Sequence, residues 1–183
     1  MNQPLVSVLM PSYNKAPYIG EAIESVLCQT YRNLELIVVD DASTDGSWEV
    51  IQAYQKRFPY TIKAVQQPHS GGCAARNKAF ALSSGKYIQY LDADDILDPE
   101  KIAAQMNVFT GTGEEDYVAN GKLARFYTSD YRKENLFWQP SLPAWEDITN
   151  DEWLKLGWIS HITCWLTPRR LIVLAGGWDE ELP

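Results

Sequence analysis

Short apolar runs alternate with amphipathic stretches over the first half of the chain. The near-continuous apolar runs predict buried strands over residues 5–10, 34–39, 61–65 and 86–91. Apolar residues at helical spacing predict helices over residues 18–27, 48–54 and 74–82. A fourth helix is expected after Asp98, which can cap it, and Pro99, which suits a first helical turn. Strands and helices that alternate in this way indicate an α/β fold, with a mostly parallel sheet and helices on both faces.

The second half of the chain has a less regular pattern. It predicts a strand over residues 116–127, a loop over 130–143, a short helix over 151–156, a strand over 162–167 and a helix from 168 to 176. In the first half, Gly85 is expected to end the third helix in the left-handed conformation. The change of pattern divides one domain into two parts, residues 1–110 and residues 111–183.

The composition fits a single globular domain with an acidic surface. The chain has 183 residues, with 16 Lys and Arg against 24 Asp and Glu. The resulting net charge of −8 argues against nucleic-acid binding, because phosphate backbones would be repelled. Cys28, Cys73 and Cys164 form no CxxC pair, so we expect reduced cysteines and no zinc knuckle. No signal-peptide pattern and no apolar run long enough to span a bilayer is found, so we expect a cytoplasmic location.

Polar residues follow three of the predicted strands at the point where each strand ends. Residues 11–14 (Pro-Ser-Tyr-Asn) follow the first strand, Asp40 and Asp41 the second, and residues 92–95 (Asp-Ala-Asp-Asp) the fourth. In parallel sheets, ligands bind beyond the carboxyl ends of the strands. We therefore expect these residues to meet at one edge of the sheet and to form a binding site there.

Asp92 and Asp94 have the spacing that suits a divalent metal ion. On an extended backbone, residues two apart point the same way, so the two carboxylates repel each other unless a cation lies between them. Mg²⁺ and Mn²⁺ prefer oxygen ligands and combine one or two carboxylates with substrate phosphates. The alternative is an acidic turn in which Asp95 or Asp98 caps the following helix.

Three further groups of residues can contact a nucleotide: Asp40 with Asp41, Pro11 with Tyr13, and the segment from Gly71 to Arg76. Asp40 and Asp41 can accept hydrogen bonds from a base or a ribose, or they can hold a turn with Ser43 or Asp45. Pro11 and Tyr13 can form an apolar wall for a base, although simple packing also explains Tyr13.

Gly71 and Gly72 come directly before the third helix, and Arg76 and Asn77 follow one turn later. Paired glycines let a helix N-terminus approach an anion, and Arg76 could then reach a phosphate. The alternative is a tight loop and a solvated Arg76. Neither a P-loop nor a dinucleotide-binding motif is present.

Aromatic and histidine residues give weaker signals. Six of the seven tryptophans lie in the second half: Trp138, Trp145, Trp153, Trp158, Trp165 and Trp178. They could line a carbohydrate groove or pack in the core, and we favour the core for most of them. His69 and His161 have no His or Cys partner at metal-ligand spacing, so both are interpreted as ordinary residues.

Three blocks of sequence together resemble glycosyltransferase family 2, whose members have the GT-A fold. They read VSVLMPSYNKAPYIGEAIESVLCQTYRNLELIVVDDASTDGS, GGCAARNKAFALSSGKYIQYLDADD and GGWDEEL. The resemblance is dense over residues 4–110, thin over 111–160, and returns over 176–182. It implies an inverting transfer of a sugar from a nucleotide donor, with UDP expected, to a glycan, lipid or other hydroxyl acceptor, assisted by Mn²⁺ or Mg²⁺. It also implies a role in polysaccharide synthesis for the cell envelope.

The resemblance implies roles for the residues that match the family's motifs. The positions that hold the base and ribose are matched by Pro11, Tyr13 and Asp41, with Asp40 as a neighbour that supports their loop. Arg76 matches a residue near the donor phosphates. Asp92 matches the first motif carboxylate, which contacts ribose or metal, and Asp94 matches the principal metal ligand. Residues 1–110 would then bind the nucleotide-sugar, and residues 111–183 would lie on the acceptor side.

The family's acceptor-activating base lies several residues after the element matched by GGWDEEL. It is therefore expected beyond Pro183, and Asp179, Glu180 and Glu181 are not assigned to that role. The chain is interpreted as a piece of a longer enzyme, which could act at the cytoplasmic face of the membrane.

Two other functions stay open. The first is a fragment that binds nucleotide-sugar without transferring it. The second, a nucleotidyltransferase, ranks lower because Lys15 alone offers a basic group near the first loop, and no glycine-rich loop accompanies it.

Overall fold

The computed structural model describes residues 3–112, 117–121, 124–125, 137–138 and 161–182. Five strands form one mixed sheet in the order β3-β2-β1-β4-β7. Their bounds are Val6–Ser12 for β1, Leu34–Asp40 for β2, Ile62–Gln66 for β3, Tyr87–Tyr90 for β4 and Leu166–Pro168 for β7. The first four strands are parallel, and β7 runs antiparallel to β4 at the sheet edge.

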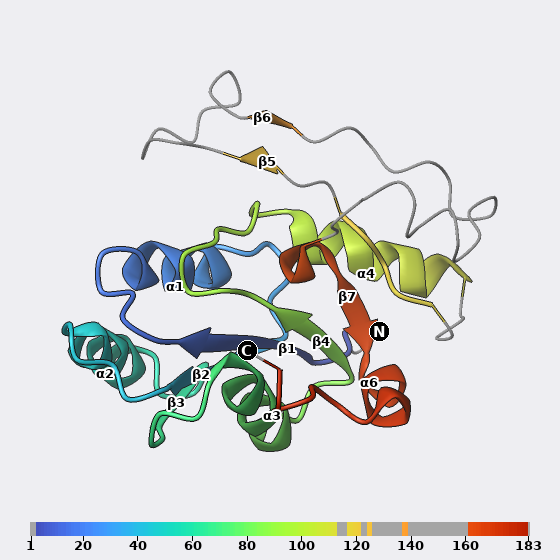
Figure 1. Cartoon of the computed structure of the whole chain (residues 1–183). Helices are drawn as coiled ribbons and strands as arrows, with labels where there is room; N and C mark the ends of the chain where they lie inside the picture. The colour runs from blue at the N-terminus through green and yellow to red at the C-terminus, as the bar shows by residue number, and fades with distance from the viewer. Residues whose placement is uncertain (1–2, 113–116, 122–123, 126–136, 139–160, 183) are drawn as a thin grey trace.

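Helices cover both faces of this sheet (Figure 1). They are α1 (Ile19–Leu27), α2 (Ser47–Arg57), α3 (Gly72–Leu82), α4 (Lys101–Thr112) and α6 (Arg169–Ala175). Residues of α1, α2 and α4 join one core cluster with one face of the sheet, and residues of α3 and α6 join a second cluster with the other face. The predicted α/β architecture with a mostly parallel sheet is therefore confirmed.

Successive side chains of a strand point to opposite faces of the sheet, which explains why there are two core clusters. Val6, Val8 and Met10 of β1 are fully buried in the first cluster, while Leu9, which points the other way, is fully buried in the second. The helices supply matching apolar faces, such as Ile19 and Ile23 of α1. The four strands and four helices of the first half differ from their predicted bounds by a few residues at most.

Three predictions for single segments were wrong in whole or in part. Gly85 is not left-handed, and Ser83 is the residue that follows the last turn of α3. A Cβ at Gly85 would lie 2.5 Å from Ser7 Oγ, so glycine is required by close approach to β1. The strand expected over 162–167 is confirmed only at its end, where β7 begins at Leu166, because Ile162–Cys164 forms a short 3-10 helix, η3. The loop expected over 130–143 contains strand β6 (Phe137–Trp138), which pairs with β5 (Ala124–Arg125).

Other predictions for the second half have mixed outcomes. The helix that stops at Gly176 is confirmed, because α6 ends there with Gly176 in the left-handed conformation. The strand expected over 116–127 is described only in part, as β5 and a bridge between Ala119 and Leu166. The helix expected over 151–156 lies outside the described residues.

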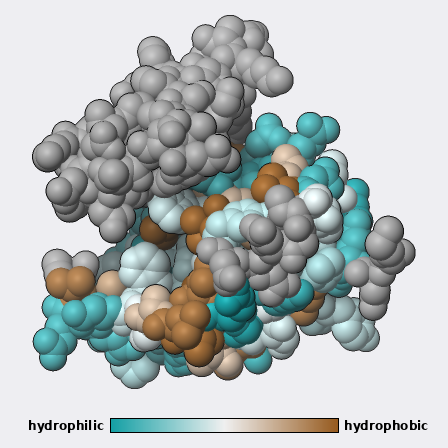
Figure 2. Space-filling model, turned by 90° about the vertical axis from the view of Figure 1, so that its right-hand side faces the viewer, coloured by the Kyte–Doolittle hydropathy of each residue, from teal (hydrophilic) through white to brown (hydrophobic). Residues whose placement is uncertain are grey.

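The surface near α6 carries exposed apolar side chains. Val173 and Leu174 are exposed there. Figure 2, which looks onto the right-hand side of the view in Figure 1, shows a hydrophobic area low on that side of the molecule. Among the described helices, none combines the length and the apolar character that a membrane span requires.

Candidate functional site

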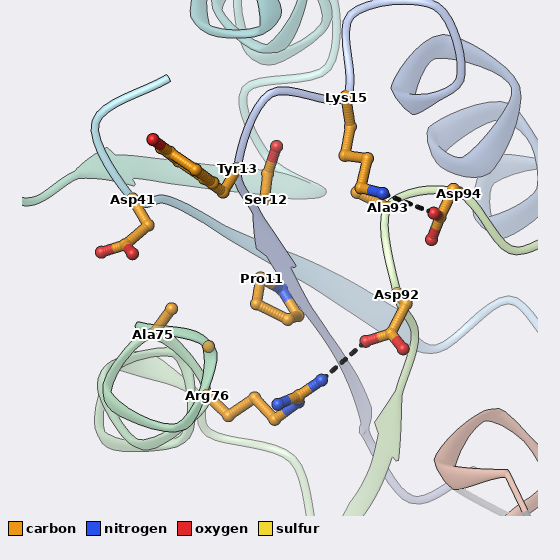
Figure 3. A pocket seen from close by; sticks show the side chains of 11 residues that line it. Pro11, Ser12, Tyr13, Lys15, Asp41, Ala75, Arg76, Asp92, Ala93 and Asp94 are labelled. Atoms are coloured by element: carbon orange, nitrogen blue, oxygen red, sulfur yellow. Dashed lines mark hydrogen bonds and ion pairs between the residues drawn. The ribbon is translucent and has the colours of Figure 1, made fainter. Parts of the chain in front are cut away.

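A cavity of about 450 Å³ lies where the carboxyl ends of β1, β2 and β4 meet the start of α3 (Figure 3). Its lining combines acidic, basic and apolar residues from these four places, and consists of Pro11, Ser12, Tyr13, Lys15, Asp41, Gly72, Ala75, Arg76, Asp92, Ala93 and Asp94. The sheet edge predicted from the sequence therefore carries a hollow of suitable size for a small polar ligand.

The loop after β1 is held by the loop after β2. Asn14 adopts a left-handed conformation with φ 51°. Its backbone N–H donates to Ser43 Oγ at 2.9 Å, and its side-chain oxygen accepts from the Thr44 N–H at 2.8 Å. One residue further on, the Lys15 N–H donates to Ser47 Oγ at 2.8 Å. These bonds fix the segment that presents Tyr13 and Lys15 to the cavity.

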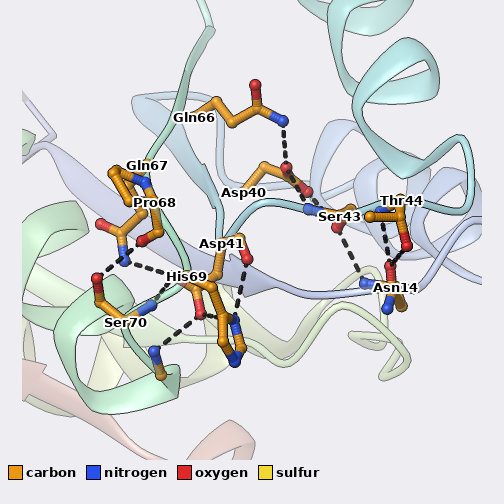
Figure 4. Close-up of polar contacts among 11 residues, drawn as sticks. Asn14, Asp40, Asp41, Ser43, Thr44, Gln66, Gln67, Pro68, His69 and Ser70 are labelled. Carbon is orange, nitrogen blue, oxygen red and sulfur yellow. Dashed lines mark hydrogen bonds and ion pairs between the residues drawn. The ribbon is translucent and has the colours of Figure 1, made fainter.

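Asp40 is not among the residues that line the cavity, and it organises the turn after β2 (Figure 4). It is fully buried. Its carboxylate accepts hydrogen bonds from the Ser43 N–H at 3.0 Å, from Ser43 Oγ at 2.5 Å, and from Gln66 Nε2 at 2.9 Å. The arrangement includes the turn with Ser43 that the sequence left open.

Asp41 lines the cavity, but its carboxylate already has several donors from the loop before α3. Gln67 Nε2 and the Ser70 N–H donate to Oδ1 at 2.7 and 2.9 Å, and the Gly71 N–H donates to Oδ2 at 2.9 Å. Burial by itself would raise the pKa of Asp41, but these hydrogen bonds and nearby His69 outweigh it and lower the pKa. Asp41 is therefore an ionised anchor for the Ser70–Gly71 turn.

His69 packs against Tyr13, although it is not itself among the residues that line the cavity. Its ring lies 4.4 Å from the ring of Tyr13, centroid to centroid, and its Nδ1 lies 2.9 Å from Asp41 Oδ2. Tyr13 itself is 45% exposed, which leaves its ring available to a ligand. The interpretation of His69 as an ordinary residue missed this pairing, because nothing in the local pattern links it to Tyr13.

Arg76 joins α3 to the acidic loop after β4. Its Nη2 donates to Asp92 Oδ1 at 2.9 Å, and its guanidinium lies 4.9 Å from the ring centroid of Trp178. Arg76 Nε is buried and has no hydrogen-bond partner among the described residues. Arg76 is thus held at the cavity by these contacts. The alternative interpretation of the sequence, a solvated Arg76, does not describe this arrangement.

Asn77 ties the segment after α6 to the same helix. Its Nδ2 donates to the Trp178 carbonyl and to Glu180, both at 2.8 Å, and its Oδ1 accepts from the Trp178 N–H at 2.9 Å. Trp178 also packs edge-on against Tyr90 of β4. The GGWDEEL segment therefore packs beside Arg76, although the two are far apart in the sequence.

Lys15 pairs with the second carboxylate of the acidic loop. Its Nζ lies 2.6 Å from Asp94 Oδ2, and this hydrogen bond raises the pKa of Lys15 despite the opposing effect of burial. Each of the two expected metal ligands therefore has a basic partner from another element: Asp92 has Arg76, and Asp94 has Lys15 (Figure 3).

His161 lies beside the acidic loop although it is far away in sequence. Its Nε2 is 3.7 Å from Asp92 Oδ2, and its Nδ1 is 3.3 Å from Asp95 Oδ2. Thr163 Oγ1 donates to Asp95 Oδ2 at 2.6 Å. Burial raises the pKa of Asp95, with Asp92 and Asp94 adding to the shift and Thr163 and His161 opposing it.

Asp92, Asp95 and His161 have the geometry of a metal-binding group. One ligand atom from each lies within 4.8 Å of the others. Carboxylate oxygens suit Mn²⁺ and an imidazole nitrogen suits divalent transition-metal ions, so the residues present fit a divalent ion. The sequence predicted Asp92 and Asp94 as ligands. Among the described residues, the structure groups Asp92 with Asp95 and His161, which the local spacing did not indicate, and Asp94 is not part of that group.

The late tryptophans are only partly described. Trp178 packs against Tyr90 and Arg76, whereas Trp145, Trp153 and Trp158 lie outside the described residues. All three cysteines are free thiols, as expected.

Comparisons with known proteins agree with this fold. The model of the family described as Glycosyl transferase family 2 matches residues 7–173. A putative teichuronic acid biosynthesis glycosyltransferase, TuaG of Bacillus subtilis, is 40% identical over 104 residues, which make up 57% of this chain and 41% of TuaG. The chain spans less than half the length of the curated relatives it matches.

Solved structures share the fold over nearly the whole chain. The mannosyltransferase PcManGT from Pyrobaculum calidifontis, in complex with GDP-Man and Mn²⁺, matches with a TM-score of 0.73 and 22% identity, covering 99% of this chain and 49% of PcManGT. TarS 1-349 from S. aureus, in complex with UDP, matches with a TM-score of 0.71 and 23% identity, covering 97% of this chain and 51% of that one.

Proposed function

The chain belongs to glycosyl transferase family 2, and on this premise we propose that it transfers a sugar from a nucleoside diphosphate, UDP, to a hydroxyl group of a glycan or lipid acceptor. The transfer inverts the anomeric carbon and depends on a divalent metal ion. The acceptor belongs to a cell-envelope polysaccharide, and the name of the relative TuaG supports this class.

One observation carries the proposal. Carboxylates, two basic side chains and an aromatic ring, which come from four separate parts of the chain, converge on one cavity at the carboxyl edge of the sheet. A nucleoside diphosphate needs this combination, because it has a flat base, a ribose with hydroxyl groups, and two charged phosphates. The solved structures with UDP, or with GDP-Man and Mn²⁺, support the choice of ligand.

The metal ion would be held by Asp92 and Asp94, with Asp95 of the same loop and His161, which directly precedes η3, as further donors. When bound, such an ion supplies positive charge that stabilises the departing diphosphate. Carboxylate oxygens are the donors that suit Mn²⁺ or Mg²⁺.

The chain's own residues bind and orient the donor. Tyr13 stacks on the base beside His69, and Pro11 and Asp41 complete the base and ribose side of the cavity. Arg76 and Lys15, which neutralise Asp92 and Asp94 in this structure, can turn to the phosphates when a cation takes over that task. The acceptor hydroxyl attacks the anomeric carbon from the face opposite to the nucleotide while the bond from that carbon to the diphosphate breaks, which produces inversion. The hydroxyl proton goes to a general base that is not assigned among the described residues.

Calorimetric titration of UDP into the chain tests the proposal, first with Mn²⁺ and then with a chelator. We expect binding only with the metal. The same titration with GDP and dTDP tests the choice of base. Absence of binding with all three nucleotides would contradict the proposal.

An Asp94→Ala variant tests the metal site directly. We expect the metal-dependent affinity for UDP to fall at least about tenfold, since even the loss of outer-shell partners of a metal costs that much. Glu49→Ala, which removes an exposed carboxylate of α2, is the matched control and should bind as the wild type does. Unchanged affinity in Asp94→Ala would remove Asp94 from the site.

Two other functions give different outcomes in a transfer assay. Metal-dependent binding of UDP without turnover of a UDP-sugar would favour the nucleotide-sugar-binding alternative. Release of pyrophosphate from a nucleoside triphosphate and a sugar phosphate would favour a nucleotidyltransferase.

A further inference from the structure

Lys101, the first residue of α4, has an ammonium group that points into the protein. It donates to the side-chain oxygen of Gln89 and, at 2.7 Å, to that of Gln105. No described carboxylate forms an ion pair with it, and burial lowers its pKa to about 7. A lysine in such a place is costly, because the charged form loses its hydration. It therefore calls for a role beyond packing.

The lysine determines which way two buried glutamine amides face. Gln89 and Gln105 are almost completely buried. An amide has an accepting end and a donating end, so a donor on the oxygen directs the NH₂ group to the opposite side. Gln89 Nε2 donates to the Thr163 carbonyl at 2.9 Å, and Gln105 Nε2 donates to the Cys164 and Ala119 carbonyls, both at 2.8 Å.

These carbonyls belong to η3 and to the bridge beside it, which are packed closely. A Cβ at Gly121 would lie 3.3 Å from the Cys164 carbonyl oxygen and 3.5 Å from Gln105 Nε2, so the segment has little room to shift. Because η3 carries Thr163, and His161 precedes it directly, two hydrogen-bonded glutamines hold the backbone that presents both side chains.

The same two side chains reach the acidic loop of the cavity. Thr163 Oγ1 donates to Asp95 at 2.6 Å, and His161 Nε2 lies 3.7 Å from Asp92 Oδ2. A continuous chain of contacts thus runs from Lys101, through Gln89 and Gln105, to η3 and then to Asp92 and Asp95. Neither Gln89 nor Gln105, the side chains to which Lys101 donates, lines the cavity.

We propose that Lys101 is a positioning residue for the donor site: by orienting Gln89 and Gln105 it holds η3 against the Asp92–Asp95 loop, and so sets the affinity of that loop for a divalent cation. The inference rests on the proposed function, because it assigns the cation to the same loop. Outer-shell partners that orient ligands typically change metal affinity by about 10–100-fold.

The test measures Mn²⁺ affinity in the presence of UDP, from the paramagnetic resonance signal of free Mn²⁺. Lys101→Met keeps the length of the side chain and removes the donors, and we expect affinity to fall about tenfold. Thr163→Val cuts the last link, to Asp95. If both act along one path, the double variant loses about as much as the more affected single variant rather than the product of the two losses.

Two controls separate positioning from loss of fold. Lys56→Met removes an exposed lysine of α2 and should bind Mn²⁺ normally. Gln105→Glu keeps the acceptor for Lys101 but removes the donor to Cys164, so it should lose affinity like Lys101→Met, and it carries the test if Lys101→Met does not fold.

The outcomes distinguish the two proposals. Wild-type protein that binds no Mn²⁺ with UDP would overturn the proposed function. Wild-type protein that binds, together with folded Lys101→Met or Gln105→Glu that binds equally well, would overturn the positioning role alone. Losses that multiply in the double variant would also overturn it, because Lys101 would then act independently of Thr163.

Discussion

Each of the three carboxylates in the loop after β4 meets a basic or polar partner from a distant part of the chain. Asp94 faces Lys15, Asp92 faces Arg76, and Asp95 faces Thr163. Such pairs keep a cluster of like charges together when no cation is bound, and they place the basic groups where phosphates would arrive. Single residues of this site therefore have separable effects on binding and on stability.

Arg76→Met should weaken the binding of UDP about tenfold, because a charge-assisted hydrogen bond contributes about 1.5–3 kcal/mol. Uridine, which has no phosphate, should bind equally well to the variant and the wild type. Titration of both ligands checks this expectation. Lys78→Met, two residues further along α3, is the control, and an equal loss for uridine would contradict a phosphate role.

Asp41→Asn should lower the free energy of unfolding by about 1–3 kcal/mol at neutral pH, because an amide leaves a donor among Gln67, Ser70 and Gly71 without an acceptor. The folded pKa of Asp41 lies below the ordinary value of 3.8. Its stabilising effect is thus present above that value and is lost as the pH falls through the folded pKa.

Urea unfolding at neutral and acidic pH measures this effect. The difference between wild type and Asp41→Asn should shrink below about pH 4. Asp179→Asn, at an exposed carboxylate, should show no such difference at either pH. A gap that stays constant with pH would show that Asp41 does not act through its charge.

At the level of elements, the start of β4 is fixed by its contact with the start of β1. Gly85 N–H donates to Ser7 Oγ at 2.7 Å, and Ser7 Oγ donates to Glu35 of β2 at 2.6 Å. The register of β4 decides where the Asp92–Asp95 loop begins. The contact between Gly85 and Ser7, at the amino ends of the strands, therefore controls the position of the site at their carboxyl ends.

Gly85→Ala should destabilise the fold by at least about 1–3 kcal/mol, because the new methyl group would meet backbone and Ser7 at less than 3 Å. Gly111→Ala in α4 is the control, since nothing lies within 4 Å of its Cβ position, and alanine favours a helix. Thermal unfolding of both variants checks this. Equal melting temperatures would contradict the close approach.

For the whole molecule, the strand order determines which loops can cooperate. In the order β3-β2-β1-β4-β7, β1 lies between β2 and β4, so the loops after these three strands converge from one edge. The fold around this edge is stabilised by any ligand that binds to it and not to the unfolded chain.

UDP with Mn²⁺, at about 100 times its Kd, should therefore stabilise the chain by about 2.7 kcal/mol. For a chain of this length the melting temperature would rise by roughly 5–10 °C. A thermal scan with UDP and Mn²⁺, and a second with UDP and chelator, measures the shift. The same rise with chelator would contradict metal dependence.

The sequence alone determined the architecture of the first half of the chain and several residues of the candidate site. Buried strands and amphipathic helices have periods that are visible along the chain, and the carboxyl ends of parallel strands share one edge by geometry. Asp92, Asp94, Asp41 and Arg76 could be selected in this way, because each lies directly at a strand end or a helix start.

Only the tertiary structure decided the contacts that join residues distant in sequence. His161 and Thr163 reach Asp92 and Asp95 across more than sixty residues, and Lys101 acts through two glutamines with no local signature. Gly85 is a glycine for a reason that lies in β1. A local pattern reports only the backbone conformation and the buried face of its own segment, whereas these roles depend on which other segment packs against that face.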